Sequence, residues 1–194
     1  DYSWDNLLPL TYTRPASEIR IGILKISEKW EHHLGTKPYH LTRDYLSDKY
    51  TLKTQDQNIV INGSVLPDSK LVQGVQNLEP GQALVNQDEI IAANLTKEQV
   101  FEFNEKQLRE IDVLEHREDI LKINRPWEIF KNNGAAIRAD FELITKGRQT
   151  QPVSDTNRVI GGGEIFIEPG ATVECATLNT TNGPIYIGRD AEVM

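Results

Sequence analysis

The chain has 194 residues, of which 38% are hydrophobic and 26% charged, an ordinary composition for a globular protein. A net charge of −8 without any Lys/Arg run argues against a nucleic-acid surface. No stretch reaches the roughly 20 apolar residues of a membrane span, and the single Cys175 excludes an intrachain disulfide and a cysteine-based metal site. We therefore expect a cytoplasmic protein with no nucleic-acid and no membrane partner.

The first patterned segment follows a turn-rich opening. Its apolar residues recur at intervals of four, three, four and four, and Gly35 follows as a C-cap. This spacing predicts a helix that begins near Ser17 or Gly22 and ends at Leu34. Residues 36–57 are polar, with no more than a helical turn begun at Thr42. The apolar residues are Ile19, Ile23, Ile26, Trp30 and Leu34.

Strand and helix patterns then alternate up to residue 144. Residues 58–63, Asn-Ile-Val-Ile-Asn-Gly, predict a buried strand that ends in a turn. Asp68 caps one predicted helix, and Thr96 caps another over 97–103. Such alternation favours an α/β domain. The remaining predicted elements are strands at 83–85, 89–92 and 112–114, and a helix over 127–142.

The last 35 residues repeat with a period of six. Ile167 and Val173 lie six apart, as do Ile187 and Val193. This period fits neither an α-helix nor an ordinary strand, and it is typical of a parallel β-helix with three faces per coil. The alternative is two unrelated edge strands with turns between them.

The polar, non-periodic residues 145–158 indicate a domain boundary. We therefore expect a domain of residues 1–150, followed in 151–194 by the truncated first coils of a left-handed parallel β-helix. A β-helix must stack several coils to bury its core, and here the pattern stops at Met194.

Residues 8–15, Leu-Pro-Leu-Thr-Tyr-Thr-Arg-Pro, form the first segment that suggests chemistry. They combine hydroxyls, backbone N–H groups and the Arg14 guanidinium near a helix start, and Lys25 and Lys29 follow. Such a set of groups can hold phosphate oxygens. The alternative is a loop in which Arg14 pairs with a surface acid such as Glu18.

Three segments resemble the sugar-1-phosphate nucleotidyltransferases. Residues 7–15 are similar to the entry segment of that family, where Pro-Leu-Thr-x-Thr-Arg-Pro-Lys follows a glycine-rich loop. Residues 59–66, Ile-Val-Ile-Asn-Gly-Ser-Val-Leu, are similar to a family strand that ends in Gly-Asp. Residues 126–133, Pro-Trp-Glu-Ile-Phe-Lys-Asn-Asn, resemble a Pro-Trp-Asp-aliphatic-x-x-Asn segment.

Together with the six-residue repeats, the order of these segments resembles the bifunctional family of N-acetylglucosamine-1-phosphate uridylyltransferase/acetyltransferases. It is also similar to two-domain sugar nucleotidyltransferases of Bacteroides-like bacteria. The resemblance implies a nucleotidyltransferase-like three-layer α/β domain, a left-handed β-helix and a homotrimer formed through that β-helix.

The implied reaction transfers a nucleotide, most simply UMP from UTP, onto a sugar-1-phosphate such as N-acetylglucosamine-1-phosphate and releases pyrophosphate. The substrates are thus a nucleoside triphosphate and a sugar-1-phosphate, and an acyltransferase activity could lie in further coils. The resemblance also assigns roles to individual residues. Arg14, Lys25 and Lys29 are the expected catalytic cations, Glu128 the expected Mg²⁺ ligand, and the expected substrate-binding residues are Thr11, Thr13, Asn62 and Gly63.

The chain departs from the family pattern at several positions. Ser64 stands where the family has a metal-binding Asp, and Ala16 stands where it has Lys. Residues 1–6 contain no glycine that could form the phosphate loop, and residues 145–194 contain no His to serve as an acetyltransferase base. The alternative is therefore a catalytically degenerate module that retains the fold and serves binding or trimer assembly.

Overall fold

The computed structural model describes residues 3–102 and 111–194. Their contacts divide the chain into two compact units. The N-terminal unit comprises residues 1–20 and 25–129, and the C-terminal unit comprises residues 21–24 and 130–194. The domain boundary after residue 150 stays a prediction. Among the described residues, no helix has both the length and the apolar character needed to cross a membrane.

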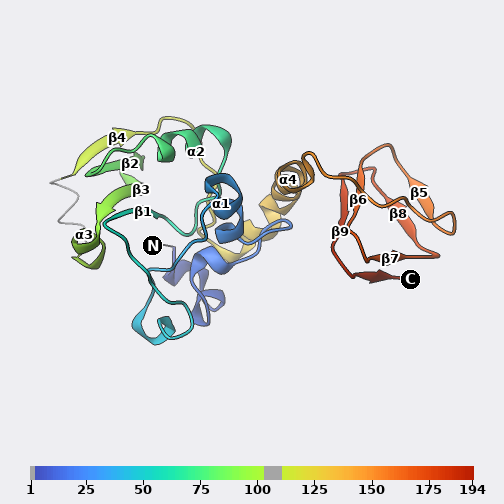
Figure 1. Ribbon diagram of the computed structural model, residues 1–194, viewed down its shortest axis with the longest axis horizontal. Coiled ribbons are helices and arrows are strands. Elements are labelled where there is room, and N and C mark those ends of the chain that lie inside the picture. Colours follow the sequence, from blue (N-terminus) through green and yellow to red (C-terminus); the bar gives the residue numbers. More distant parts are fainter. Residues whose placement is uncertain (1–2, 103–110) are drawn as a thin grey trace. The chain divides into compact units, whose positions relative to one another are not determined.

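A four-stranded mixed sheet forms the centre of the N-terminal unit (Figure 1). Its strand order is β1-β3-β2-β4. β3 pairs antiparallel with both β1 and β2, whereas β2 and β4 are parallel. All four strands were predicted from the sequence, and their bounds are Gln57–Ile61 (β1), Gln82–Asn86 (β2), Glu89–Thr96 (β3) and Asp112–Glu115 (β4).

Three α-helices accompany this sheet: α1 (Ile26–Leu34), α2 (Ser69–Gln76) and α3 (Lys97–Glu102). The predicted cap of α2 is confirmed, because the Asp68 carboxylate accepts hydrogen bonds from two backbone N–H groups of the first turn, each at 2.9 Å. α3 contacts β1 and β3. Its predicted extension to Phe103 lies outside the described residues. Short 3-10 turns occupy Asp5–Leu7, Leu10–Tyr12, Ala16–Glu18 and Asp44–Leu46.

The predicted early start of the first helix is wrong. α1 begins at Ile26, and Gly22 has a positive φ of 79° that no α-helix accommodates. The Gly22 N–H donates to Asn133 Oδ1 at 2.7 Å, and the Ile23 N–H donates to Asp140 Oδ2 at 2.8 Å. These tertiary hydrogen bonds replace the helical ones. The predicted end is correct, since Gly35 adopts the left-handed conformation of a C-cap.

Buried apolar side chains of the sheet meet those of the helices in the core of the N-terminal unit. One cluster joins β2, β3 and α3 with Ile111. Leu71 and Val75 of α2 are also fully or almost fully buried. The cluster consists of Ala83, Ala93, Leu95, Val100 and Ile111.

The C-terminal unit contains most of α4 (Pro126–Thr145) and six short strands (Figure 1). These strands form three parallel pairs, β5·β8, β6·β9 and β7·β10. Arg158 pairs with Thr177, Ile165 with Ile185 and Thr172 with Glu192, so each partner lies 19 or 20 residues further on. Their bounds are Arg158–Ile160, Ile165–Ile167, Thr172–Val173, Thr177–Asn179, Ile185–Ile187 and Glu192–Val193.

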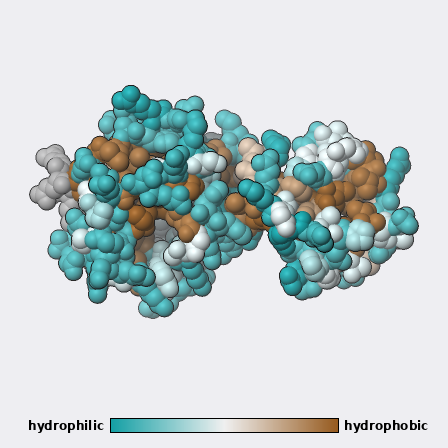
Figure 2. All heavy atoms as spheres, turned by 45° about the horizontal axis from the view of Figure 1, so that its top comes forward, coloured by the Kyte–Doolittle hydropathy of each residue, from teal (hydrophilic) through white to brown (hydrophobic). Residues whose placement is uncertain are grey.

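The residues of the six-residue pattern face each other across these pairs. Ile167 pairs with Ile187 and Val173 with Val193, and Leu178 joins them in one apolar cluster. Apolar side chains also remain on the surface of this unit, at the right of Figure 2. The alternative of unrelated edge strands is therefore wrong, because the segments stack in parallel. The left-handed winding stays a prediction.

Candidate functional site

Residues 3–18 run through three 3-10 turns, held in shape by their own polar groups. The Thr11 hydroxyl is fully buried and donates to the Trp4 carbonyl at 2.7 Å. Its role in the structure is therefore to fix the turn that precedes Thr13 and Arg14. Both of these side chains are exposed to solvent and are free to meet a ligand.

The turn at the end of β1 is held by a network of side-chain hydrogen bonds. Asn62 Oδ1 accepts from the Ser64 N–H at 3.1 Å and from the Ser64 hydroxyl at 2.8 Å. The Asn62 amide donates to Glu89 Oε1 at 3.0 Å. Ser3 donates to the fully buried Ser64 at 3.1 Å. The N-terminal segment is thus attached directly to this turn.

The residues just after this turn pair with the segment that leads into α4. Residues 64–66 pair with residues 121–123, through Leu66 N–H to the Leu121 carbonyl at 2.8 Å and Ile123 N–H to the Ser64 carbonyl at 2.9 Å. Lys122 extends to Glu89, with Nζ and Oε1 2.6 Å apart. Because Glu89 also accepts from Asn62, this ion pair braces the turn.

Glu128 lies in the first turn of α4, where its carboxylate caps the helix. Oε2 accepts from the Asn124 N–H at 2.6 Å and from the Arg125 N–H at 2.9 Å. This is the reciprocal half of a capping box, which satisfies backbone N–H groups that a helix start leaves unpaired. Asn6 donates to the Asn124 side chain at 3.1 Å, so the N-terminal segment reaches this helix start as well.

Lys25 belongs to a polar cluster around Glu18. Its ammonium lies 2.8 Å from Glu18 Oε2, and the Ser27 hydroxyl donates to Oε1 at 2.7 Å. His40 Nε2 lies 3.4 Å from the same Oε1, and its Nδ1 lies 3.1 Å from the Ser17 hydroxyl. Glu18 therefore pairs with Lys25 and not, as the alternative interpretation of the loop had it, with Arg14.

The cluster sets the charge of its members. Burial alone would raise the pKa of Glu18, but hydrogen bonds from Lys25 and Ser27 outweigh it, so the pKa is lowered. The hydrogen bond to Glu18 raises the pKa of Lys25. Burial lowers the pKa of His40, and the charge of Glu18 opposes this only in part. At neutral pH, Glu18 and Lys25 are thus a charged pair beside a neutral imidazole.

A cavity of about 980 Å³ lies in the N-terminal unit. One wall is formed by residues 57–63, which are β1 and the turn after it, and the others include residues of α1 and of the segments 34–41 and 52–55. Ser17, Ser27 and His40 contribute the polar cluster to this lining.

The structure brings together some of the predicted site residues and separates others. Asn62 and Gly63 line the cavity. A side chain at Gly63 would lie 3.2 Å from Ser17, so the turn packs closely against the segment just after Arg14. Lys29 is buried in α1, with 3% of its surface exposed. The predicted site residues that are not part of the cavity lining are Thr11, Thr13, Arg14, Lys25, Lys29 and Glu128.

The described residues form no ready-made cluster of ligands for Mg²⁺. No group of three or more His, Cys, Asp or Glu side chains among residues 3–102 and 111–194 is arranged to hold a metal ion. Mg²⁺ is usually held by one or two carboxylates together with substrate phosphates. Here Glu128 has one oxygen engaged in capping, and the Ser64 hydroxyl is buried in hydrogen bonds. We therefore assign no reaction step to a metal ion.

Sequence reasoning missed several residues of this region. His40 lies in a polar segment without periodicity, and nothing there indicates that it meets Ser17, 23 residues away. Lys122 lies in a mixed-charge stretch, and its partner Glu89 is 33 residues away. Asp140 is 2% exposed, although nothing in the helical pattern of its segment indicates a buried carboxylate. All three depend on contacts between distant parts of the chain.

The profile of a family described as "Sugar nucleotidyl transferase" matches residues 1–149, more than half of the chain. The chain belongs to the sugar nucleotidyl transferase family. Membership implies a transferase of the class that moves a nucleotide onto a sugar phosphate, and it implies a nucleotide and a sugar phosphate as the ligands. Members of this class generally use divalent metal ions. The curated proteins contain no match to the chain.

Proposed function

We propose that the protein joins a nucleoside monophosphate to a sugar-1-phosphate, with UTP and N-acetylglucosamine-1-phosphate as its first candidate substrates. An oxygen of the sugar phosphate attacks the α-phosphorus of the triphosphate. A new P–O bond forms there, the bond to the bridging oxygen of the β-phosphate breaks, and pyrophosphate leaves with the electron pair. The attacking oxygen is already ionised, so no proton has to be removed.

One observation carries the proposal: the family match covers the same residues that build the Asn62–Gly63 turn and its cavity. Ser17 packs closely on Gly63 of this turn. The exposed Arg14 lies only a few residues before Ser17 in the chain and is therefore held near the turn. Its guanidinium would bind phosphate oxygens in a bidentate manner. Asn62 and Gly63 would line the sugar or nucleotide site, with Thr13 beside Arg14.

The two lysines have different roles in this proposal. Lys25 is charged but paired with Glu18, so it would act on a phosphate only if the substrate competed with that carboxylate. Lys29 is buried and would act through the position of α1. Arg14 is thus the cation from which we expect the largest effect on phosphate binding.

Pyrophosphate release tests the proposal directly. The protein is incubated with each nucleoside triphosphate, each of several hexose-1-phosphates and a divalent metal salt, and pyrophosphate is measured by a coupled assay. We expect release with at least one pair and a loss of at least about tenfold in kcat/KM for Arg14→Ala. Arg189→Ala, an exposed arginine of the C-terminal unit, is the matched control and should retain activity. The absence of turnover with every pair would remove the assignment.

The second candidate is a degenerate module that binds these ligands without turnover. The capping role of Glu128 and the buried hydroxyl at Ser64 favour it. Calorimetry separates the two candidates: binding of UTP or of the sugar phosphate without pyrophosphate release would support the module, whereas turnover excludes it.

The parallel strand pairs of the C-terminal unit support a further part of the proposal, a left-handed β-helix that assembles three chains. Light scattering coupled to size-exclusion chromatography should then give three times the monomer mass. A monomer at all concentrations would contradict it. An acyltransferase activity would be tested separately, with acetyl-CoA.

A further inference from the structure

The polar cluster around Glu18 engages two hydroxyl groups that line the cavity. These hydroxyls belong to Ser17 and Ser27. The Ser27 hydroxyl donates to Glu18 Oε1 at 2.7 Å, and the Ser17 hydroxyl lies 3.1 Å from His40 Nδ1. The proposed transfer removes no proton, so it gives His40 and these hydroxyls no role.

Glu18 determines which nitrogen of the His40 ring carries the proton. Its carboxylate lies 3.4 Å from Nε2, and the hydrogen bonds from Lys25 and Ser27 keep it ionised. A lone pair on Nε2 would face this negative charge, whereas an N–H group there is attracted to it. The neutral ring therefore carries its proton on Nε2, and Nδ1 is left as an acceptor.

This tautomer fixes the direction of the hydrogen bond between Ser17 and His40. Because Nδ1 accepts, the Ser17 hydroxyl donates, and its oxygen keeps two lone pairs. No other hydrogen bond of this hydroxyl occurs within residues 3–102 and 111–194. Ser17 therefore presents an acceptor, and not a donor, to the cavity that it lines.

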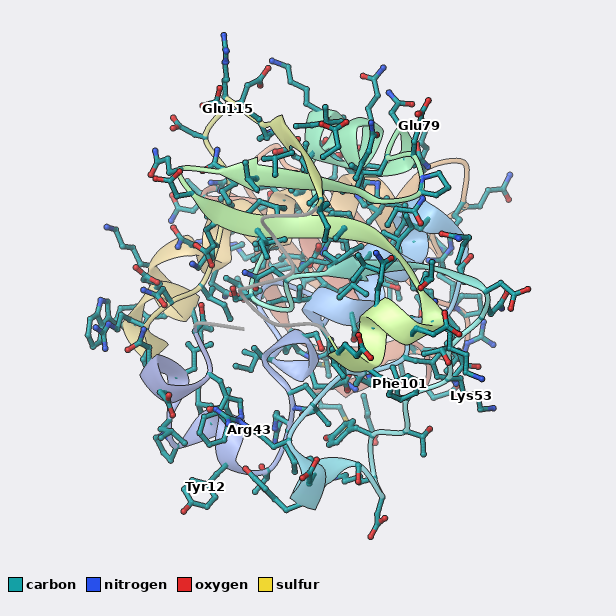
Figure 3. The ribbon with its side chains drawn as sticks, turned by 90° about the vertical axis from the view of Figure 1, so that its left-hand side faces the viewer. Tyr12, Arg43, Lys53, Glu79, Phe101 and Glu115 are labelled. Atoms are coloured by element: carbon teal, nitrogen blue, oxygen red, sulfur yellow. The ribbon has the colours of Figure 1, made fainter. Side chains whose placement is uncertain are left out.

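Ser17 adjoins the part of the cavity where the proposed function places a substrate. A side chain at Gly63 would lie 3.2 Å from the Cβ and N atoms of Ser17. The cavity reaches the surface of the N-terminal unit at Lys53, an exposed residue of its lining that Figure 3 shows at the periphery. A ligand in this cavity can therefore contact Ser17 and the Asn62–Gly63 turn together.

An acceptor at this place distinguishes the two ends of a substrate. Ionised phosphate oxygens are themselves acceptors and gain no hydrogen bond from Ser17, whereas sugar hydroxyls, an acetamido N–H and the uracil N–H are donors. A site built to hydrogen-bond a substrate O–H or N–H discriminates strongly against the analogue that lacks it. The uncharged end of a substrate is thus the part that Ser17 can recognise.

We propose that Ser17, with its proton held by His40, is a specificity-determining residue that accepts a hydrogen bond from a hydroxyl or N–H group on the uncharged end of the bound sugar phosphate or nucleotide. His40 acts through Ser17 and is a positioning residue. The inference rests on the proposed function for its ligands, but the direction of the hydrogen bond can be tested without any ligand.

Nitrogen NMR of the free protein tests this direction. In protein labelled with ¹⁵N-histidine, chemical shifts distinguish a protonated ring nitrogen from an unprotonated one, and His40→Gln identifies the signals of His40 by their loss. At pH 7.5 we expect a protonated Nε2 and an unprotonated Nδ1. A proton on Nδ1 would overturn the proposal, because the Ser17 oxygen would then accept from the ring and its own proton would face the cavity.

Calorimetry with matched ligands and a divalent metal salt tests the recognition. The parent ligands are N-acetylglucosamine-1-phosphate and UTP. We expect one analogue to bind the original chain at least about threefold more weakly than its parent, but to bind Ser17→Ala within about twofold of that parent. The analogue that behaves in this way shows whether the donor belongs to the sugar or to the nucleotide. Each analogue lacks one donor: the 3-, 4- and 6-deoxy sugars, the sugar with a 2-O-acetyl ester in place of the amide, 2′-deoxy-UTP, 3′-deoxy-UTP and N3-methyl-UTP.

Two further variants separate recognition from a structural role. His40→Ala keeps the Ser17 hydroxyl but frees its proton to face the ligand, so the preference for the parent over this analogue should fall to less than half. An unchanged preference in His40→Ala would contradict the positioning role. Ser69→Ala, an exposed serine outside the cavity lining, is the matched control and should keep the full preference.

The outcomes distinguish this inference from the proposed function. If pyrophosphate is released but no analogue depends on Ser17, the inference is wrong and the proposed function stands. If an analogue depends on Ser17 and no pyrophosphate is released, the inference stands and the proposed turnover fails. If neither parent binds, both are overturned.

Discussion

The two units differ in how far apart in sequence their contacting residues lie. In the C-terminal unit, each strand pairs with the one 19 or 20 residues later, and the apolar cluster repeats the same few positions. In the N-terminal unit, the candidate site joins Ser3 to Ser64 and Asn6 to Asn124. A repeat thus specifies its own neighbours, whereas the site exists only after distant segments have met.

The largest effect should come from the core of the C-terminal unit. Leu178→Ala removes a side chain that is 6% exposed in the apolar cluster, and we expect a loss of about 2–4 kcal/mol. Amide exchange of β6, β8 and β9 measures it. The three tryptophans, Trp4, Trp30 and Trp127, lie in the N-terminal unit, so their fluorescence reports that unit alone.

The matched control for Leu178→Ala is Thr177→Ala, an exposed neighbour on β8, which should cost less than about 0.5 kcal/mol. The tryptophan fluorescence of Leu178→Ala should therefore report an unchanged stability of the N-terminal unit. If it reported the same loss as the amide exchange of the C-terminal strands, the comparison would fail, because the two units would then unfold as one.

A somewhat smaller effect is expected where residues 21–24 meet α4. Asp140 Oδ2 accepts from the Ile23 and Leu24 N–H groups at 2.8 and 3.0 Å. Asp140→Ala removes the acceptor of both hydrogen bonds, at a cost of about 2–3 kcal/mol, visible as faster exchange of these two amides. Asp140→Asn retains an acceptor oxygen and should lose less. Equal losses in the two variants would show that the hydrogen bonds are not the cause.

Glu168, the residue that follows β6, carries a charge that makes the stability of the C-terminal unit depend on pH. Glu168 accepts from Arg148 and from the Arg189 N–H, the latter at 2.8 Å. The hydrogen bond from Arg148, aided by Tyr186, lowers the pKa of Glu168 to about 2. A lowered carboxylate pKa stabilises the fold above the unfolded value near 4.5, and this stability is lost as the pH falls from 4.5 towards 2.

The expected loss is about 1–3 kcal/mol, measured as urea unfolding by circular dichroism at pH 7, 5 and 3. Glu168→Gln should flatten the pH dependence, whereas the exposed Glu192→Gln should leave it unchanged. A Glu168→Gln variant with the original pH profile would remove Glu168 as its source.

The smallest effect on stability is expected at Glu128, which is also the most informative position for function. Glu128→Ala removes the cap of α4 and should cost about 1 kcal/mol. Glu128→Gln retains a capping oxygen and should cost less, as thermal unfolding would measure. If Glu128 also held a metal ion, both variants would lose turnover. If it only caps the helix, Glu128→Gln should retain turnover.

Local signals predicted most elements but few of the contacts that make the site. The Asp68 cap, the strand before Asn62 and the end of α1 at Gly35 follow from neighbouring residues, and each is confirmed. Residues 19–25 carry the same helical spacing as α1, yet hydrogen bonds to Asn133 and Asp140 hold them in a turn. Helical spacing records only which residues are apolar, and a buried carboxylate 117 residues away outweighs it.

The sequence alone determined that two kinds of pattern follow each other in the chain, and that Arg14, Asn62 and Gly63 belong to segments with possible chemistry. Tertiary structure decided which of these segments meet. It placed Ser17 against Gly63 and committed Glu128 to a helix cap. Periodicity and capping act within a few residues, whereas burial and hydrogen bonding between distant segments depend on the folded chain as a whole.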